Sequence, residues 1–294
     1  MNPIDPATTV GAVQLTVSDL DRSRAFYERA LGMRSQETED GGLTLGAFGV
    51  AEPLLELHGD SAAAPHDPRR TGLFHFAVLV ADRRELSLAL LRLARSGWPL
   101  SGASDHLVSE ALYLDDPDGN GIELYRDRPR TEWRRDEDGQ LQMATLPLDL
   151  HGLLAEAGDE VASQAVDDLG LPAGTRMGHV HLQVSELART EDFYSGVLGF
   201  DVMVRGYPGA LFVAAGGYHH HIGLNTWNSR GAQGPPPGAV GLRSFDVRLP
   251  DPAALADVVE RVRAAGLPME ALPDGGSLVR DPSGNGIRLT ARAT

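Results

Sequence analysis

Apolar and polar residues alternate along several short segments, and each of these segments leads into a stretch with helical periodicity. Residues 13–17 (VQLTV) and 180–184 (VHLQV) have the period-2 pattern of half-buried strands. Each passes through an acidic residue into an amphipathic helix that contains Phe-Tyr and ends at Leu-Gly. The two stretches, 13–33 and 180–200, match closely, so the sequence predicts an internal repeat.

A second pair of segments also matches. Residues 73–98 parallel residues 242–267 as a strand and a helix, and DPDGNGIE at 116–123 parallels DPSGNGIR at 281–288. Such a turn reverses the chain between two strands, because Pro fixes φ while Gly and Asn accept positive φ. The sequence therefore predicts an α+β fold of four βαβββ modules, at roughly 10–59, 72–127, 177–227 and 240–292.

The modules predict two domains in tandem. Residues 1–130 would form the first domain from modules one and two, and residues 176–294 the second from modules three and four. The polar segment 131–175 between them is predicted to be a linker with a short helix, in the acidic stretch 153–168. The Gly- and Pro-rich residues 231–238 should form a loop that joins modules three and four.

Composition narrows the possible functions. The 294 residues hold no Cys and no Lys, which excludes disulfides, thiolate catalysis and lysine Schiff bases. The formal charge of −15 argues against nucleic acid and against anionic membranes as partners. No apolar run approaches the ~20 residues of a membrane span, and residues 1–6 (MNPIDP) lack the features of a signal peptide. We therefore expect a cytoplasmic protein.

Two polar residues stand in otherwise apolar strands. Glu123 alternates with Ile122 and Leu124, and His75 is the polar side chain of 73–80 (LFHFAVLV). A carboxylate is costly to bury unless something neutralises it, and a metal ion is one answer. The alternatives are a solvated Glu on an outer face and a histidine satisfied in the core. Because a facial metal site uses two His and one carboxylate, a third ligand would have to come from elsewhere.

The four modules and the turn motif resemble the vicinal oxygen chelate superfamily of glyoxalase I, bleomycin-resistance proteins and extradiol dioxygenases. The stretch from His106 through Tyr113 to Glu123 is similar to the signature of extradiol ring-cleaving dioxygenases, although Ser104 departs from it. The overall layout is similar to bacillar-type catechol 2,3-dioxygenases. The resemblance covers nearly the whole chain.

The resemblance also implies where the metal ligands lie. In this superfamily the first-strand ligand comes seven residues before the acidic residue that starts the helix. The rule selects His75 and His179. His181 is a rival for His179, because it lies on the same face of the strand. The alternative is that His179 and His181 are strand histidines without a ligand role. In modules one and four it selects Ala12 and Ser244, which bind no metal. The implied ligands are therefore His75, Glu123 and His179.

This ligand set predicts that modules two and three pair around one cleft. Modules one and four would pair as a half without ligands, where Arg288 stands at the position of Glu123. The alternative is that modules pair in sequence order and a second chain completes the site. A homo-oligomer is compatible with either arrangement.

The resemblance implies the chemistry as well. Fe(II), or Mn(II) with the same ligands, would bind a small aromatic diol and O2. His220 would act as the acid/base, while His106 and Tyr113 would bond oxygens of the substrate and dioxygen. His219 and His221 should point to the opposite strand face from His220, unless the three form a surface cluster.

Three other functions compete with this one. A hydroquinone-cleaving dioxygenase would use the same metal set. A glyoxalase-like isomerase would need a second carboxylate, which the histidine strand of module three does not supply. Glu56 could supply an acid in module one, but Ala12 leaves that module without a first-strand ligand. A ligand-binding resistance protein would need neither metal ligands nor acid/base histidines.

Overall fold

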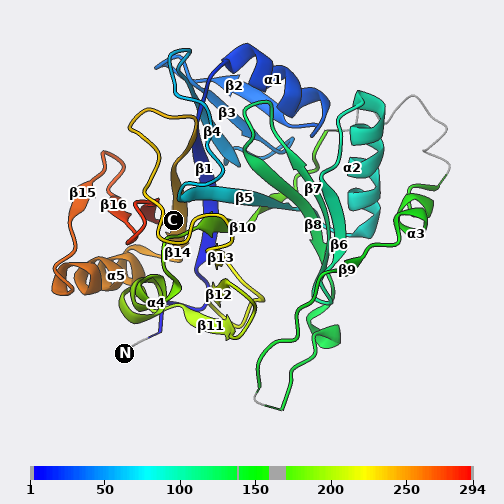
Figure 1. The fold of residues 1–294 in the computed structure, drawn as a ribbon. Coiled ribbons are helices and arrows are strands. Elements are labelled where there is room, and N and C mark those ends of the chain that lie inside the picture. The colour runs from blue at the N-terminus through cyan, green and yellow to red at the C-terminus, as the bar shows by residue number, and fades with distance from the viewer. Residues whose placement is uncertain (1–2, 138, 159–169, 293–294) are drawn as a thin grey trace.

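The computed structural model describes residues 3–137, 139–158 and 170–292 and contains the four βαβββ modules that the sequence predicts (Figure 1). Module one comprises β1 (Thr9–Val17), α1 (Leu20–Arg29), β2 (Arg34–Glu37), β3 (Leu43–Gly46) and β4 (Leu55–Gly59). Module two comprises β5 (Gly72–Leu79), α2 (Arg83–Ser96), β6 (Gly102–Asp105), β7 (Ser109–Asp115) and β8 (Gly121–Asp127).

The second half of the chain repeats this order. Module three comprises β10 (Arg176–Gln183), α4 (Leu187–Glu191), the π-helical turn η4 (Asp192–Val197), β11 (Asp201–Val204), β12 (Ala210–Ala214) and β13 (Ile222–Asn225). Module four comprises β14 (Gly241–Leu249), α5 (Pro252–Ala264), β15 (Met269–Ala271), β16 (Ser277–Arg280) and β17 (Gly286–Ala291).

The acidic residues that follow the first strands are the N-caps of the four module helices. The side chains of Asp19, Asp82 and Asp251 accept hydrogen bonds from backbone N–H groups of the first turn, whereas Glu186 occupies the cap position without such a bond. A capping carboxylate satisfies an amide that has no partner inside the helix and favours the positive end of the helix dipole. The repeated capping residue thus marks the same strand–helix junction in every module.

The strands form two sheets, and each sheet combines one module from each half of the chain. Modules two and three build a nine-stranded sheet in the order β11-β12-β13-β10-β5-β8-β7-β6-β9, where β9 is Leu146–Pro147. Modules one and four build an eight-stranded sheet in the order β15-β16-β17-β14-β1-β4-β3-β2. The predicted pairing of modules is therefore confirmed within one chain. The division into domains at residues 130 and 176 stays a prediction.

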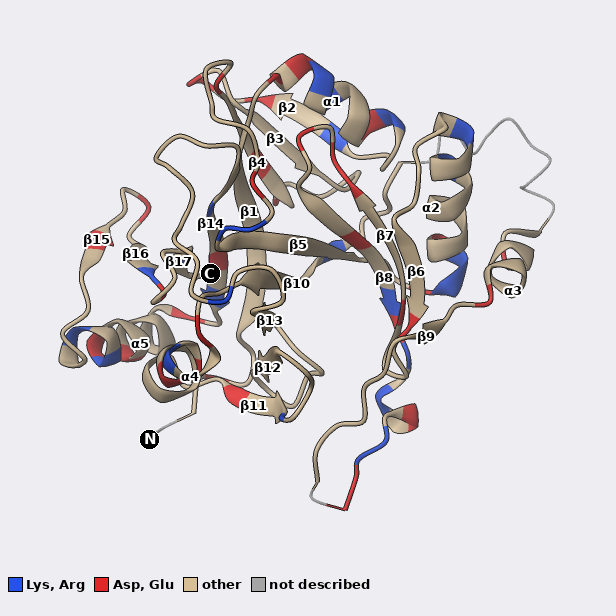
Figure 2. Ribbon diagram, in the orientation of Figure 1, with Lys and Arg blue, Asp and Glu red and all other residues tan. Residues whose placement is uncertain are grey.

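The sheets meet along their central strands, where β1 contacts β10 and β14 contacts β5. The helices lie on the outside, with α2 beside β8 and α5 beside β14 and β17 (Figure 1). Charged residues gather on α1, α2 and α5, whereas β5 carries none along its length (Figure 2). Alternate apolar residues of the strands from all four modules enter one large core cluster, which explains the period-2 pattern of the strands.

The segment between the halves is more than a linker. It contains the 3₁₀ turn η1 (Arg130–Glu132), β9 and the short helix α3 (Leu150–Ala155). Strand β9 extends the nine-stranded sheet by pairing with β6, and α3 contacts α2. The helix predicted at 153–168 overlaps α3, but its residues from 159 onward lie outside the described residues. Among the helices of the described residues, none has the length and apolar character to cross a bilayer.

Candidate metal and catalytic site

Three neighbouring strands bring His75, Glu123 and His179 together. Strand β5 pairs with β10 on one side and with β8 on the other, so the three side chains share one face. Oε2 of Glu123 lies 3.0 Å from Nε2 of His75 and 3.1 Å from Nε2 of His179. One ligand atom from each residue lies within 4.8 Å of the others, and all three residues are buried. The donor set and its spacing fit a metal of the facial two-His-one-carboxylate type.

The electrostatics of these groups also suit a metal. Burial acts to raise the pKa of Glu123, but the imidazoles of His179 and His75 outweigh burial and hold this pKa well below its usual value. Burial lowers the pKa of His179 to about 4, against the opposing charge of Glu123. Glu123 is thus ionised and His179 neutral at neutral pH, which are the forms that bind metal ions.

His181 lies beside this triplet. Its Cα is paired with that of His75 across the two strands, and its ring packs between Phe74 and Trp227. Nε2 of His181 is buried without a hydrogen-bond partner, and burial lowers the pKa of the ring well below its usual value. The structure therefore places the rival histidine in the wall of the adjacent cavity, outside the triplet.

His106 and Tyr113 form a hydrogen-bonded pair on the hairpin of β6 and β7. Nε2 of His106 lies 2.7 Å from the hydroxyl of Tyr113, and Nδ1 lies 2.7 Å from the carbonyl oxygen of Ala144. A carbonyl only accepts, so Nδ1 carries the proton and Nε2 of the neutral ring accepts from Tyr113. Tyr113 is also the cross-strand neighbour of Glu123. Burial, then the charge of Glu123, raises the pKa of Tyr113 well above its usual value, which keeps it a donor.

The three consecutive histidines precede β13, which begins at Ile222, so the prediction that they start this strand is wrong. All three are buried, so they are not a surface cluster either. Because this stretch is a bend, the period-2 alternation does not apply. His220 lines the cavity, with its ring 4.0 Å from that of His179, centroid to centroid. His219 bonds both His220 and Asp127, and Nδ1 of His221 accepts from the backbone of Ala215.

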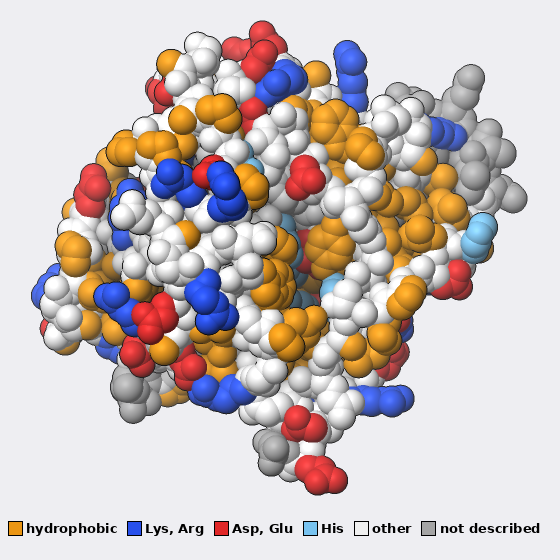
Figure 3. Space-filling model, in the orientation of Figure 1, with side chains coloured by type: hydrophobic (Ala, Val, Ile, Leu, Met, Phe, Trp, Pro, Cys, Tyr) orange, Lys and Arg blue, Asp and Glu red, His pale blue; other side chains and the backbone are white. Residues whose placement is uncertain are grey.

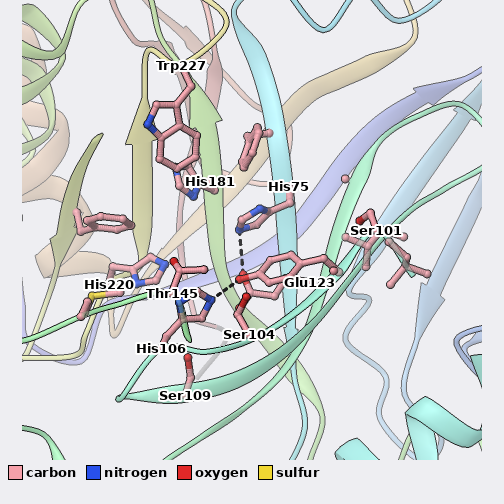
Figure 4. Close-up of a pocket in the computed structure, with 18 of the residues that line it drawn as sticks. His75, Ser101, Ser104, His106, Ser109, Glu123, Thr145, His181, His220 and Trp227 are labelled. Atoms are coloured by element: carbon pink, nitrogen blue, oxygen red, sulfur yellow. Dashed lines mark hydrogen bonds and ion pairs between the residues drawn. The ribbon is translucent and has the colours of Figure 1, made fainter. Parts of the chain in front are cut away.

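A cavity of about 380 Å³ opens beside the triplet and holds the remaining predicted residues in its wall. Figure 4 shows His75, His106, His181 and His220 grouped around it, with the contact from His75 to Glu123 drawn as a dashed line. In the space-filling view, histidine side chains are visible at the bottom of a hollow with apolar sides (Figure 3). The apolar part of the wall consists of Phe74, Leu114, Ile122, Met143, Phe212 and Trp227.

Part of this wall comes from residues that sequence reasoning did not select. Met143, Ala144 and Thr145 lie in the segment that was expected to be a linker, yet they line the cavity and supply the carbonyl that orients His106. Phe212 and Trp227 face the cavity from module three. Residues 143–145 carry no periodic pattern or motif, so the sequence offered no signal for their role.

The second sheet holds an arginine where the first has its carboxylate. The guanidinium of Arg288 lies 3.5 Å from Glu56, 3.6 Å from Asp246 and 2.8 Å from Asp274. Glu56, the acid considered for an isomerase, is therefore part of an ion-pair cluster. The described residues contain one triplet of metal-ligand type, and it lies in modules two and three.

Comparison with known proteins agrees with this architecture. The family model described as Glyoxalase/Bleomycin resistance protein/Dioxygenase superfamily matches residues 9–124 and 176–289. The chain is 45% identical over 284 residues to a protein of Bacillus subtilis (strain 168) named catechol-2,3-dioxygenase, and the match covers 96% of each chain.

Solved structures show the same fold at low sequence identity. Glyoxalase I from Zea mays has a TM-score of 0.57 and 18% identity, with 96% of this chain and 92% of that chain covered. The cppA protein from Streptococcus pneumoniae TIGR4 has a TM-score of 0.54 and 13% identity, with 97% and 99% covered. At such identities these structures show likeness of fold alone.

Proposed function

This chain belongs to the glyoxalase/bleomycin resistance protein/dioxygenase superfamily, and we propose that it is an extradiol dioxygenase that cleaves the ring of a catechol with O2. The observation that carries the proposal is the convergence of two His and one Glu at a cavity that also receives His220 and the His106–Tyr113 pair. The relative named catechol-2,3-dioxygenase supports the same reaction.

His75, Glu123 and His179 would hold the metal, Fe(II) or Mn(II). Two His and one carboxylate are the donor set of facial metal sites, which keep positions open for a substrate and O2. When bound, the metal would lower the pKa of the diol and bring it together with O2 for electron transfer. The reaction inserts both atoms of O2, breaks the ring C–C bond next to the diol and yields a semialdehyde with a carboxylate.

The side chains around the ligands would handle protons and developing charge. His220 is buried at the cavity wall, and burial, then the neighbouring histidines, lowers its pKa well below the usual value. The ring is therefore neutral and able to take the second hydroxyl proton of the diol. The O–H of Tyr113, which is donated to Nε2 of His106 in this structure, would turn to an oxygen of the substrate or of dioxygen when these bind, and His106 would hold the phenol beside the cavity until then.

The wall of the cavity favours uncharged diols. Its apolar side chains surround the site, the carboxylates of Asp115 and Glu123 line it, and no Arg is among the described residues of the lining. The chain contains no Lys either. A ring substituent that carries a carboxylate would find no cation and would lose its hydration. We therefore propose catechols with neutral, apolar substituents as the substrate class.

Anaerobic loading with Fe(II), followed by catechol and air, tests the proposal. We expect one metal per chain, consumption of one O2 per catechol and a yellow ring-opened product. Loaded enzyme that consumes no oxygen with a panel of catechols and hydroquinones would overturn the dioxygenase reading. Cleavage of hydroquinones alone would move the proposal to the hydroquinone-cleaving relatives.

A further inference from the structure

A row of three side chains runs from the end of β8 to His220 at the cavity, and its first two members, Asp127 and His219, have no role in the function proposed above. Asp127 is the last residue of β8, four positions after Glu123. Its Oδ1 lies 2.9 Å from Nε2 of His219, and Nδ1 of His219 lies 2.8 Å from Nδ1 of His220. The ring of His219 is fully buried between its two partners, while the carboxylate faces a separate hollow beside Arg130.

The chemistry of the three groups decides where each proton sits. A carboxylate accepts, so Nε2 of His219 must carry the proton in this bond. A neutral imidazole has one N–H, and Nδ1 of His219 is therefore an acceptor. The bond to His220 then requires a proton on Nδ1 of His220. The remaining nitrogen, Nε2 of His220, is left without a proton and is the one available to the cavity.

A second set of bonds holds the carboxylate in place. The hydroxyl of Tyr218 donates to Asp127 at 3.0 Å, and its oxygen is 2.8 Å from the hydroxyl of Tyr125, which must be the donor there. Burial, then the charge of Asp127, raises the pKa of Tyr218 well above its usual value, so the phenol stays protonated. Tyr218 thus orients Asp127 toward His219. Because Tyr218 is a hydrogen-bond donor to Asp127, it leaves the carboxylate an acceptor for His219.

We propose that Asp127 is a positioning residue that acts through His219 and holds His220 in the tautomer whose unprotonated Nε2 faces the diol. The inference rests on the proposed function, in which His220 is the base. The carboxylate of a Ser-His-Asp triad orients its histidine by the same physical means, and changing that Asp to Asn in the protease slows turnover ~10⁴-fold through the wrong tautomer. Here one more imidazole lies between the carboxylate and the base.

The test compares Asp127→Asn with wild type in the Fe(II)-loaded enzyme. The side-chain NH2 of asparagine can donate to Nε2 of His219. His219 then carries its proton on Nδ1 and donates to Nδ1 of His220, which puts the proton of His220 on Nε2. We expect kcat for catechol to fall ~10-fold to 10³-fold, within the share of a general base, with KM and metal content changed less than about twofold. Asp127→Glu should restore most of kcat. Tyr218→Phe removes one of the bonds that orient the carboxylate but keeps the carboxylate itself, so it should lower kcat less than Asp127→Asn does.

Combining Asp127→Asn with His220→Phe separates positioning from a structural role. If the carboxylate acts through His220, the double variant should be no slower than His220→Phe alone, because effects of residues that act as a unit are not additive. Additive losses would overturn the proposal, as would an unchanged kcat in Asp127→Asn beside a slow His220→Phe. A His220→Phe enzyme with wild-type kcat would instead remove the base from the proposed function.

A direct measurement needs no turnover. ¹⁵N NMR of histidine-labelled, metal-free protein, with His220 assigned by its absence in His220→Phe, reports which ring nitrogen carries the proton. We expect protonated Nδ1 and bare Nε2 for His220. A proton on Nε2 of His220 in the wild-type protein would overturn the proposal.

Discussion

The hydroxyl of Tyr27 donates a hydrogen bond of 2.8 Å to Oδ2 of Asp116, and this bond ties a helix of one sheet to a turn of the other. Asp116 also accepts from the backbone and the side-chain amide of Asn120, so it organises the DPDGNG turn that leads into β8. The repeat reproduces the arrangement with Tyr194 and Asp281, at 3.3 Å. The Tyr of each Phe-Tyr pair and the Asp of the turn in the partner sheet thus form the same contact in both repeats.

Tyr27→Phe should lower the free energy of unfolding by ~1–3 kcal/mol, the cost of leaving a buried acceptor short of a donor. Tyr194→Phe should cost less, because its bond is longer. Urea denaturation of both variants checks this order. Equal stability of Tyr27→Phe and wild type would show that the contact contributes nothing to joining the sheets.

Glu123→Gln should sharply reduce metal content, because the site loses its charge and retains two neutral imidazoles. The matched change is His181→Gln, which alters a buried histidine on the same strand as His179 but outside the triplet, and it should leave about one metal per chain. Elemental analysis after reconstitution measures both. Full metal occupancy in a variant with His75, Glu123 and His179 all replaced by Ala would contradict the ligand assignment.

Tyr113→Phe should slow turnover by the loss of one hydrogen bond to a charged group, ~1.5–3 kcal/mol in the transition state. Metal content should stay as in wild type, since the hydroxyl contacts His106 and is not part of the triplet. His221→Gln serves as a control, because His221 bonds the backbone of Ala215 and does not line the cavity. Steady-state oxygen consumption by the two variants measures the effect. A Tyr113→Phe enzyme as fast as His221→Gln would show that the Tyr113 hydroxyl does not stabilise the transition state.

A negative charge on the ring substituent of the diol should lower kcat/KM. Desolvating a substrate carboxylate without a cation costs several kcal/mol, so 3,4-dihydroxybenzoate should react at least ~10²-fold less efficiently than 4-methylcatechol, at 1.4 kcal/mol per tenfold. The comparison uses one enzyme preparation and both diols. Equal efficiencies would mean that the carboxylate stays in water and that the apolar wall does not select against charge.

Arg288→Met should destabilise the fold without touching the metal site. It removes the guanidinium from Asp246, whose carboxyl has its pKa raised by burial, and from Glu56. Because the arginine side chain is 22% exposed, we expect ~1–3 kcal/mol, less than the ~3–5 of a fully buried pair. Thermal unfolding and metal analysis together test this; loss of metal with unchanged stability would contradict it.

The order of the modules and the starts of their helices follow from local sequence patterns. Alternation of apolar residues marks strands and the acidic residue after each first strand caps a helix, so both are properties of short stretches of chain. The repeat and the positions of Ala12 and Ser244 also led to the pairing of modules two and three, which the sheet order confirms. Metal binding by His75, Glu123 and His179 and the roles of His106, Tyr113 and His220 stay predictions, now with a geometry that fits them.

The surroundings of the three ligands, in contrast, depend on contacts between distant parts of the chain. The directions of His219, His220 and His221 could not be read from strand periodicity, because the backbone bends there before β13 begins. Met143 and Ala144 line the cavity, where Ala144 contacts His106 between β6 and β7, and Asp127 meets His219 across 92 positions of sequence. The directions of side chains in bends and connecting segments depend on such distant contacts. A local pattern of residue types therefore does not predict these directions.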